Sequence, residues 1–163
     1  MENKVGLAIR ELHRAENDLA TELLQASSRH RADHDIFYLG RDLAAWSQDH
    51  VRELAAHGKN YGVELSPEPT EEPGLLATFR QLGAELIGGH HDPALLLLKD
   101  LREIHRKAAG VSLDWEVLAQ TAQALKDSEL LTLTKACHPQ TLRQLRWANA
   151  SVKTNAAQIM VTP

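Results

Sequence analysis

The chain has 163 residues, of which 43% are hydrophobic and 25% charged, so it is the size of one domain and is neither disordered nor fibrous. With 18 Lys and Arg against 22 Asp and Glu, its net charge of −4 provides no basic field for nucleic acid. The chain contains 26 Leu and 22 Ala but only 7 Val and 5 Ile, a balance that predicts an all-α protein.

The first half of the chain predicts a helical hairpin over residues 3–58. Apolar residues recur at steps of three and four over residues 3–31, which is typical of one buried helical face. A second pattern follows the polar stretch 31–35, includes Leu43, Trp46 and Leu54, and ends at Gly58. A glycine suits the end of a helix because it adopts left-handed backbone conformations without strain.

A crossover and a set of shorter helices are predicted to follow. Residues 58–74 hold three Gly, three Pro and four Glu, so we expect a long surface connection over 59–74. Residues 75–160 predict several helices: one over 75–87, one capped by Asp92 and opened by Pro93 that ends near 109, one that starts again at Ser112 or Asp114, and a last one from Asp127. Pro139 should kink or split this last helix.

The cellular setting is predicted from features that the sequence lacks. Cys137 is the single cysteine, so no intrachain disulfide can form, which is compatible with a reducing cytoplasm. The start of the chain shows no secretory signal, and the longest apolar run, 94–98, is far shorter than the roughly 20 residues that span a bilayer. We therefore predict a cytoplasmic protein that binds neither membranes nor nucleic acid.

Two polar residues interrupt the apolar stripes of the predicted hairpin. Glu16 lies between Leu12 and Leu19, and His50 lies between Trp46 and Leu54. In a hairpin that turns near residue 34, Glu16 and His50 fall at the same level and should meet inside the protein. Because an unpaired buried charge is costly, two explanations remain open: a Glu–His hydrogen bond that fixes the helix register, or a metal site.

Further histidines widen the metal hypothesis. His138 follows Leu131 and Thr134 in the last pattern, and His105 follows Leu98 and Leu101, so both could join Glu16 and His50 around one Fe or Zn ion. His30 and His34 lie at the expected hairpin tip, where we predict a solvated cap instead.

The hairpin resembles that of the ferritin-like superfamily. The resemblance rests on AENDL (residues 15–19), on WSQDHVREL (46–54) and on the glycine-rich exit that follows. It implies an antiparallel four-helix bundle with a long crossover, and in metal-binding members a Glu on two helices and a Glu-x-x-His on the other two hold two irons. Glu16 and His50 match that pattern, whereas Ser47 stands where a Glu is expected and the last helix has no Glu-x-x-His.

These departures predict a ferritin-like protein with a degenerate metal centre, which binds a partner or serves in a stress response and lacks standard ferroxidase activity. It would hold one Fe or Zn ion or none, and would form a homo-oligomer. The alternative is a metal-free helical module for oligomerisation or adaptor binding. A third hypothesis is a mononuclear hydrolase that uses His105 or His138.

Overall fold

Long α-helices form most of the protein in the computed structural model, which describes residues 3–70 and 92–163. Neither of these two ranges contains a β-strand, so the predicted all-α class is confirmed. The helices are α1 (Lys4–Arg29), α2 (His34–Gly58), α4 (Pro93–Leu125) and α5 (Ser128–Val161), and a short 3-10 helix, η1 (Lys59–Tyr61), follows α2.

Each long helix begins at a side chain that caps its free backbone amides. Asn3, Asp33, Asp92 and Asp127 each accept a hydrogen bond from a backbone N–H two or three residues further along. Pro93 occupies the first turn of α4, where its missing N–H leaves no intrahelical bond unmade. The predicted start of a helix at Asp92 and Pro93 is therefore confirmed.

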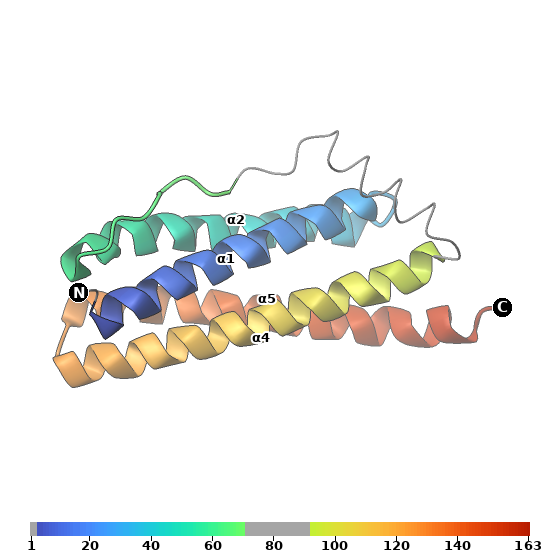
Figure 1. The fold of residues 1–163 in the computed structure, drawn as a ribbon. Coiled ribbons are helices and arrows are strands. Elements are labelled where there is room, and N and C mark those ends of the chain that lie inside the picture. The colour runs from blue at the N-terminus through green and yellow to red at the C-terminus, as the bar shows by residue number, and fades with distance from the viewer. Residues whose placement is uncertain (1–2, 71–91) are drawn as a thin grey trace.

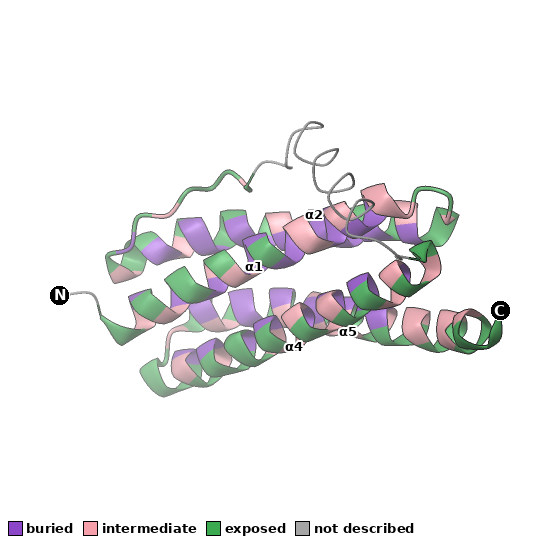
Figure 2. Ribbon diagram, turned by 45° about the vertical axis from the view of Figure 1, so that its right-hand side comes forward, coloured by how far each residue is buried: buried purple, intermediate pink, exposed green. Residues whose placement is uncertain are grey.

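The helices form a bundle in which sequence neighbours pack side by side (Figure 1). Ser27, near the end of α1, donates its hydroxyl to the carbonyl of Phe37, near the start of α2, at 2.5 Å, which fastens the two helices together beside their connection. α4 packs on α5 and also on α1, whereas α2 and α5 contact each other only sparsely. Each long helix has a buried side and an exposed side (Figure 2), and most of the buried residues are apolar.

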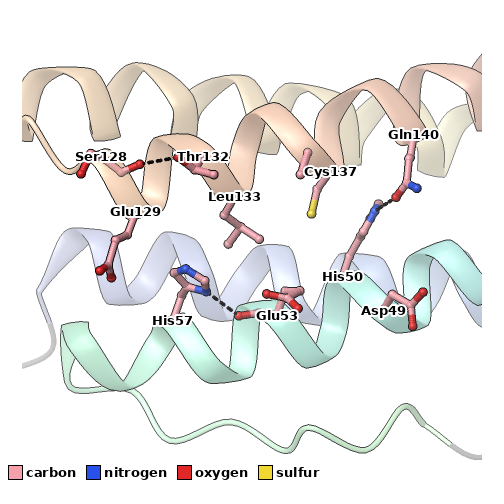
Figure 3. Close-up of a pocket in the computed structure, with 11 residues that line it drawn as sticks. Asp49, His50, Glu53, His57, Ser128, Glu129, Thr132, Leu133, Cys137 and Gln140 are labelled. Carbon is pink, nitrogen blue, oxygen red and sulfur yellow. Dashed lines mark hydrogen bonds between the residues drawn. The ribbon is translucent and has the colours of Figure 1, made fainter.

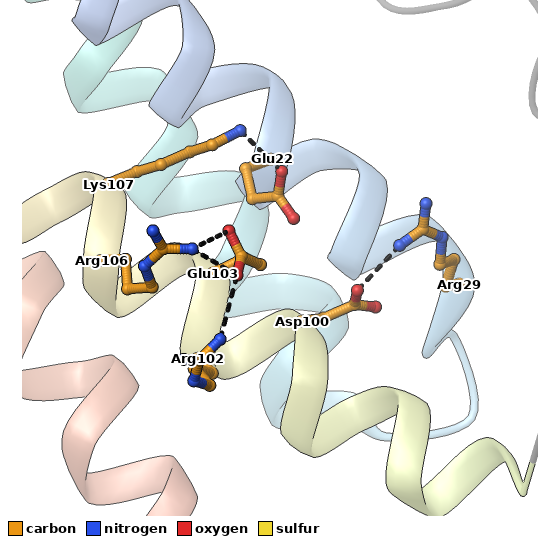
Figure 4. A network of polar contacts seen from close by, with 7 residues as sticks. All are labelled: Glu22, Arg29, Asp100, Arg102, Glu103, Arg106 and Lys107. Carbon is orange, nitrogen blue, oxygen red and sulfur yellow. Dashed lines mark hydrogen bonds and ion pairs between the residues drawn. The ribbon is translucent and has the colours of Figure 1, made fainter.

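A buried ionic cluster joins the end of α1 to the start of α4 (Figure 4). The Asp100 carboxylate accepts hydrogen bonds from Arg29 Nη1 and His30 Nε2, both at 2.8 Å. Lys107 Nζ binds Glu22 at 2.9 Å one level further along the two helices. The solvated cap predicted for His30 is wrong, because this side chain is only 9% exposed and is bound to Asp100.

The predicted crossover begins with η1, and an extended segment that follows Gly62 then returns along α1. Val63 is fully buried, His13 Nε2 donates to the Ser66 carbonyl at 2.8 Å, and the Thr70 amide donates to Asn17 Oδ1 at 2.9 Å. Residues 71–74 of the predicted crossover and the helix predicted over 75–87 lie outside the described residues.

Residues 92–163 form fewer and longer helices than the sequence predicts for this range. The expected restart at Ser112 or Asp114 is wrong, because α4 is continuous from residue 93 to 125. Its buried stripe continues in phase through Ala108, Val111 and Trp115, so nothing in the core favours a break. α5 is likewise not split, and its helix continues through Pro139.

None of the described helices combines the length and the apolar character needed for a passage through a bilayer.

Candidate functional site

The centre of the site is a buried carboxylate–imidazole pair. Glu16 and His50, which the sequence places at the same level, lie 2.7 Å apart between Oε1 and Nδ1. Their side chains are 0% and 2% exposed. The predicted meeting of these two residues is therefore confirmed, and the pair ties α1 to α2 inside the core.

α4 contributes a third member of this network, Trp115. Its indole Nε1 donates to the same Glu16 Oε1 at 2.8 Å, and its ring meets the His50 ring edge-on at a centroid distance of 5.6 Å. Trp115 is fully buried, as expected of a core tryptophan. One carboxylate oxygen therefore accepts N–H groups from both neighbouring helices.

The outer nitrogen of His50 reaches α5. His50 Nε2 donates to Gln140 Oε1 at 2.7 Å, so both ring nitrogens face oxygen acceptors. Burial by itself lowers the pKa of His50, but the Cys137 sulfur and the Glu16 carboxylate outweigh it and raise this pKa to about 10. The ring is therefore an imidazolium at neutral pH and forms a buried ion pair with Glu16.

A layer of neutral polar side chains adjoins this pair. Gln144 Nε2 donates to the Leu43 carbonyl at 2.8 Å and to Ser47 Oγ at 2.9 Å. Ser47, Thr141 and Gln144 are all fully buried. Within the described part of the chain, three buried oxygens make no hydrogen bond: Glu16 Oε2, Thr141 Oγ1 and Gln144 Oε1. These three oxygen atoms are therefore buried hydrogen-bond acceptors to which no described group donates.

The other two predicted ligands lie elsewhere. His138 is 19% exposed at its side chain and pairs with α4, through Ser112 Oγ at 2.9 Å and Glu116 Oε2 at 3.7 Å. His105 is half-buried in a shallow depression between α4 and α5, beside Arg102 and Asn149. In the ranges 3–70 and 92–163, no three His, Cys, Asp or Glu side chains come together in a group that could hold a metal ion.

An open groove lies beside His50, between α2 and α5 (Figure 3). Its volume is about 630 Å³, within the range of small-molecule sites. His50 and Cys137 line it at the end near the buried pair, and Glu53, His57 and Glu129 line it further along. The site therefore has two parts: a closed polar network and an accessible groove that share His50.

The sequence prediction missed the members of this network on α4 and α5. The position of Trp115 in an apolar stripe predicts only packing in the core, and nothing in the sequence singles out Gln140 or Gln144. One feature of the sequence could have predicted the part of the network on α5. Thr141 and Gln144 are three residues apart, and so are Ser47 and His50 on α2. Such pairs share one helical face.

No protein-family model matches this chain, and neither a curated protein nor a solved structure shows significant similarity to it. Its function is therefore argued from the geometry of the site.

Proposed function

We propose that the protein is a cytoplasmic, ferritin-like bundle with a degenerate metal centre, and that it acts as a binding protein without ferroxidase activity. The observation that carries this proposal is a set of inward-facing positions at one level of the bundle. They are Glu16 on α1, Ser47 and His50 on α2, Trp115 on α4, and Thr141 and Gln144 on α5.

The spacing of these positions supports the proposal. In ferritin-like di-iron proteins, two helices each supply one Glu and the other two each supply a Glu-x-x-His pair, all projecting inward. Here α1 and α4 each supply one position, and α2 and α5 each supply a pair three residues apart. The long connection between α2 and α4 also has its counterpart in the single crossover of that superfamily.

The residues present do not fit a pair of iron ions. A di-iron centre needs several carboxylates to bridge and neutralise the two cations, and among these positions only Glu16 has one. The indole of Trp115 offers an N–H and no acceptor, so it cannot replace a ligand. Both nitrogens of His50 are already in hydrogen bonds. This chemistry favours a structural network and a binding role over oxidation.

Metal analysis tests the proposal directly. Protein purified without chelator and then loaded anaerobically with Fe(II) should retain no stoichiometric iron after desalting, and it should not accelerate oxygen consumption. Two tightly bound irons per chain together with oxygen consumption would refute the proposal.

A second candidate function is a metal-free module for oligomerisation or adaptor binding. It is favoured by Leu113 and Val117, which lie one turn apart on α4 and are 68% and 57% exposed. A contact with a second chain on this helical face would cover both side chains. Sedimentation should then show a homo-oligomer that dissociates in the L113E variant, while a monomeric wild-type protein would contradict self-association.

A further inference from the structure

The groove between α2 and α5 exists because these two helices contact each other only sparsely. Around His50 they are joined by hydrogen bonds to Gln140 and Gln144, but towards the α4–α5 turn the space between them is open. The groove is therefore part of the bundle architecture and lies between two rigid helices.

The inner wall of the groove is largely apolar. Leu133, Ala136 and Cys137 lie along it on α5, and the first and last of these are buried at 6% and 4% exposure. A ligand of drug-fragment size that covered this wall would gain hydrophobic stabilisation in proportion to the apolar area removed from water.

The rim of the groove is acidic on both sides. Glu53 on α2 and Glu129 on α5 line it, and Figure 3 shows both near His57. Neither carboxylate forms an ion pair within the described residues, whereas Asp49 is bound by Arg52 at 2.7 Å. Of the described residues that line the groove, none is Lys or Arg. The groove is also lined by two histidines, His57 and His50, and the charge of His50 is paired with Glu16. Two carboxylates without an ion-pair partner among the described residues therefore flank one apolar surface.

We propose that this groove binds a protonated organic amine with an apolar body. The ammonium lies between Glu53 and Glu129, and the body covers Leu133 and Ala136. The inference rests on the proposed binding function and names its ligand class. An anion is disfavoured because the carboxylates repel it, and a neutral apolar ligand leaves both carboxylates without a counter-charge.

Calorimetric titration with three matched probes tests the ligand class. 4-Phenylbutylamine, 4-phenylbutan-1-ol and 4-phenylbutyrate share one body and differ in the charge of the head group. The amine should bind most tightly and the carboxylate most weakly, and the preference for the amine should decrease with added salt. Equal affinity for the amine and the alcohol would overturn the proposal.

Variants then locate the binding site. The E53Q/E129Q variant should weaken amine binding about three- to tenfold, as expected for two exposed ion pairs. The control variant D18N/D42N removes two exposed carboxylates outside the groove and should bind the amine like the wild type. The A136W variant fills the groove and should abolish binding. Unchanged binding in E53Q/E129Q would overturn the proposal.

The two proposals fail separately. Iron oxidation by the wild type would refute the proposed function even if the amine binds. An inert groove in protein that also retains no iron would refute only the ligand class. Circular dichroism of each variant confirms that a loss of binding does not come from unfolding.

Discussion

The buried pair of Glu16 and His50 makes a sharp prediction about stability and pH. The substitution Glu16→Gln removes the negative charge and keeps an amide oxygen that can still accept from Trp115. His50 then loses the carboxylate that favours its charged form, while the burial that disfavours this form remains. The pKa of His50 should therefore fall, and the stabilisation by the ion pair should disappear.

The magnitude follows from the pKa of His50. This pKa is raised from 6.5 to about 10, and each pKa unit corresponds to about 1.4 kcal/mol, so protonation of His50 stabilises the fold by about 5 kcal/mol when fully expressed. Because the folded pKa is the higher one, this stabilisation is complete below pH 6.5 and is lost as the pH rises to 10. It agrees with the roughly 3–5 kcal/mol for breaking a buried ion pair.

Urea unfolding at pH 6, 8 and 10, followed by circular dichroism, measures this effect. E16Q should be about 3–5 kcal/mol less stable than the wild type at pH 6, and the difference should shrink to below about 1 kcal/mol at pH 10. The control E11Q lies on the same helix, where Glu11 is 51% exposed and pairs with Arg14. It should change stability by less than about 1 kcal/mol at every pH.

The comparison of variant and wild type cancels the titration of distant groups that are present in both proteins. A stability difference that stays constant from pH 6 to pH 10 would show that His50 is not protonated in the folded state. A variant as stable as the wild type at pH 6 would refute the ion pair altogether.

Three further predictions concern single substitutions elsewhere in the bundle. D100N removes the buried negative charge to which Arg29 and His30 both donate and should cost about 3 kcal/mol in urea unfolding. E103Q, on the more exposed face of the same helix, should cost less than about 1 kcal/mol. G6A places a Cβ 2.6 Å from Val63 Cγ2 and should lower stability by about 1–3 kcal/mol through overpacking. G110A meets no atom within 4 Å, and thermal unfolding should show a gain of up to about 1 kcal/mol from helix propensity.

The sequence was sufficient to predict the first half of the fold and the central pair. Helix 3–31 and the helix ending at Gly58 were predicted from apolar periodicity, and α1 and α2 have nearly these bounds. Glu16 and His50 could be paired because both interrupt a stripe in one local hairpin, where register follows from the turn. The pair α1 and α2 is joined to the pair α4 and α5 by a connection of more than 30 residues. The level at which residues of one pair meet residues of the other could therefore not be predicted from the sequence.

The phase of α5 shows why the second half was harder. The sequence predicts a buried stripe through Leu131, Thr134, His138, Thr141 and Leu145. Thr134 and Thr141 are buried as predicted, whereas Leu131, His138 and Leu145 are only partly buried. Cys137 and Gln144, which carried no such prediction, are buried beside them. A hydrophobic pattern cannot find a buried face that is itself polar, and Gln144 is buried because Ser47 and the Leu43 carbonyl satisfy its amide.

Trp115 helps to explain why the charge of Glu16 can be buried at the centre of this protein although only one histidine pairs with it. A lone carboxylate in the core is costly unless donors surround it, and metal ions are one source of compensating positive charge. Here His50 supplies the charge from α2, and Trp115 supplies a further N–H from α4 while its ring occupies volume in the core. A tryptophan in an apolar stripe predicts packing alone, since the direction of its N–H depends on a partner 99 residues away. The side chain that fills the interior therefore also donates to Glu16 Oε1, while Glu16 Oε2 accepts no hydrogen bond within the described residues.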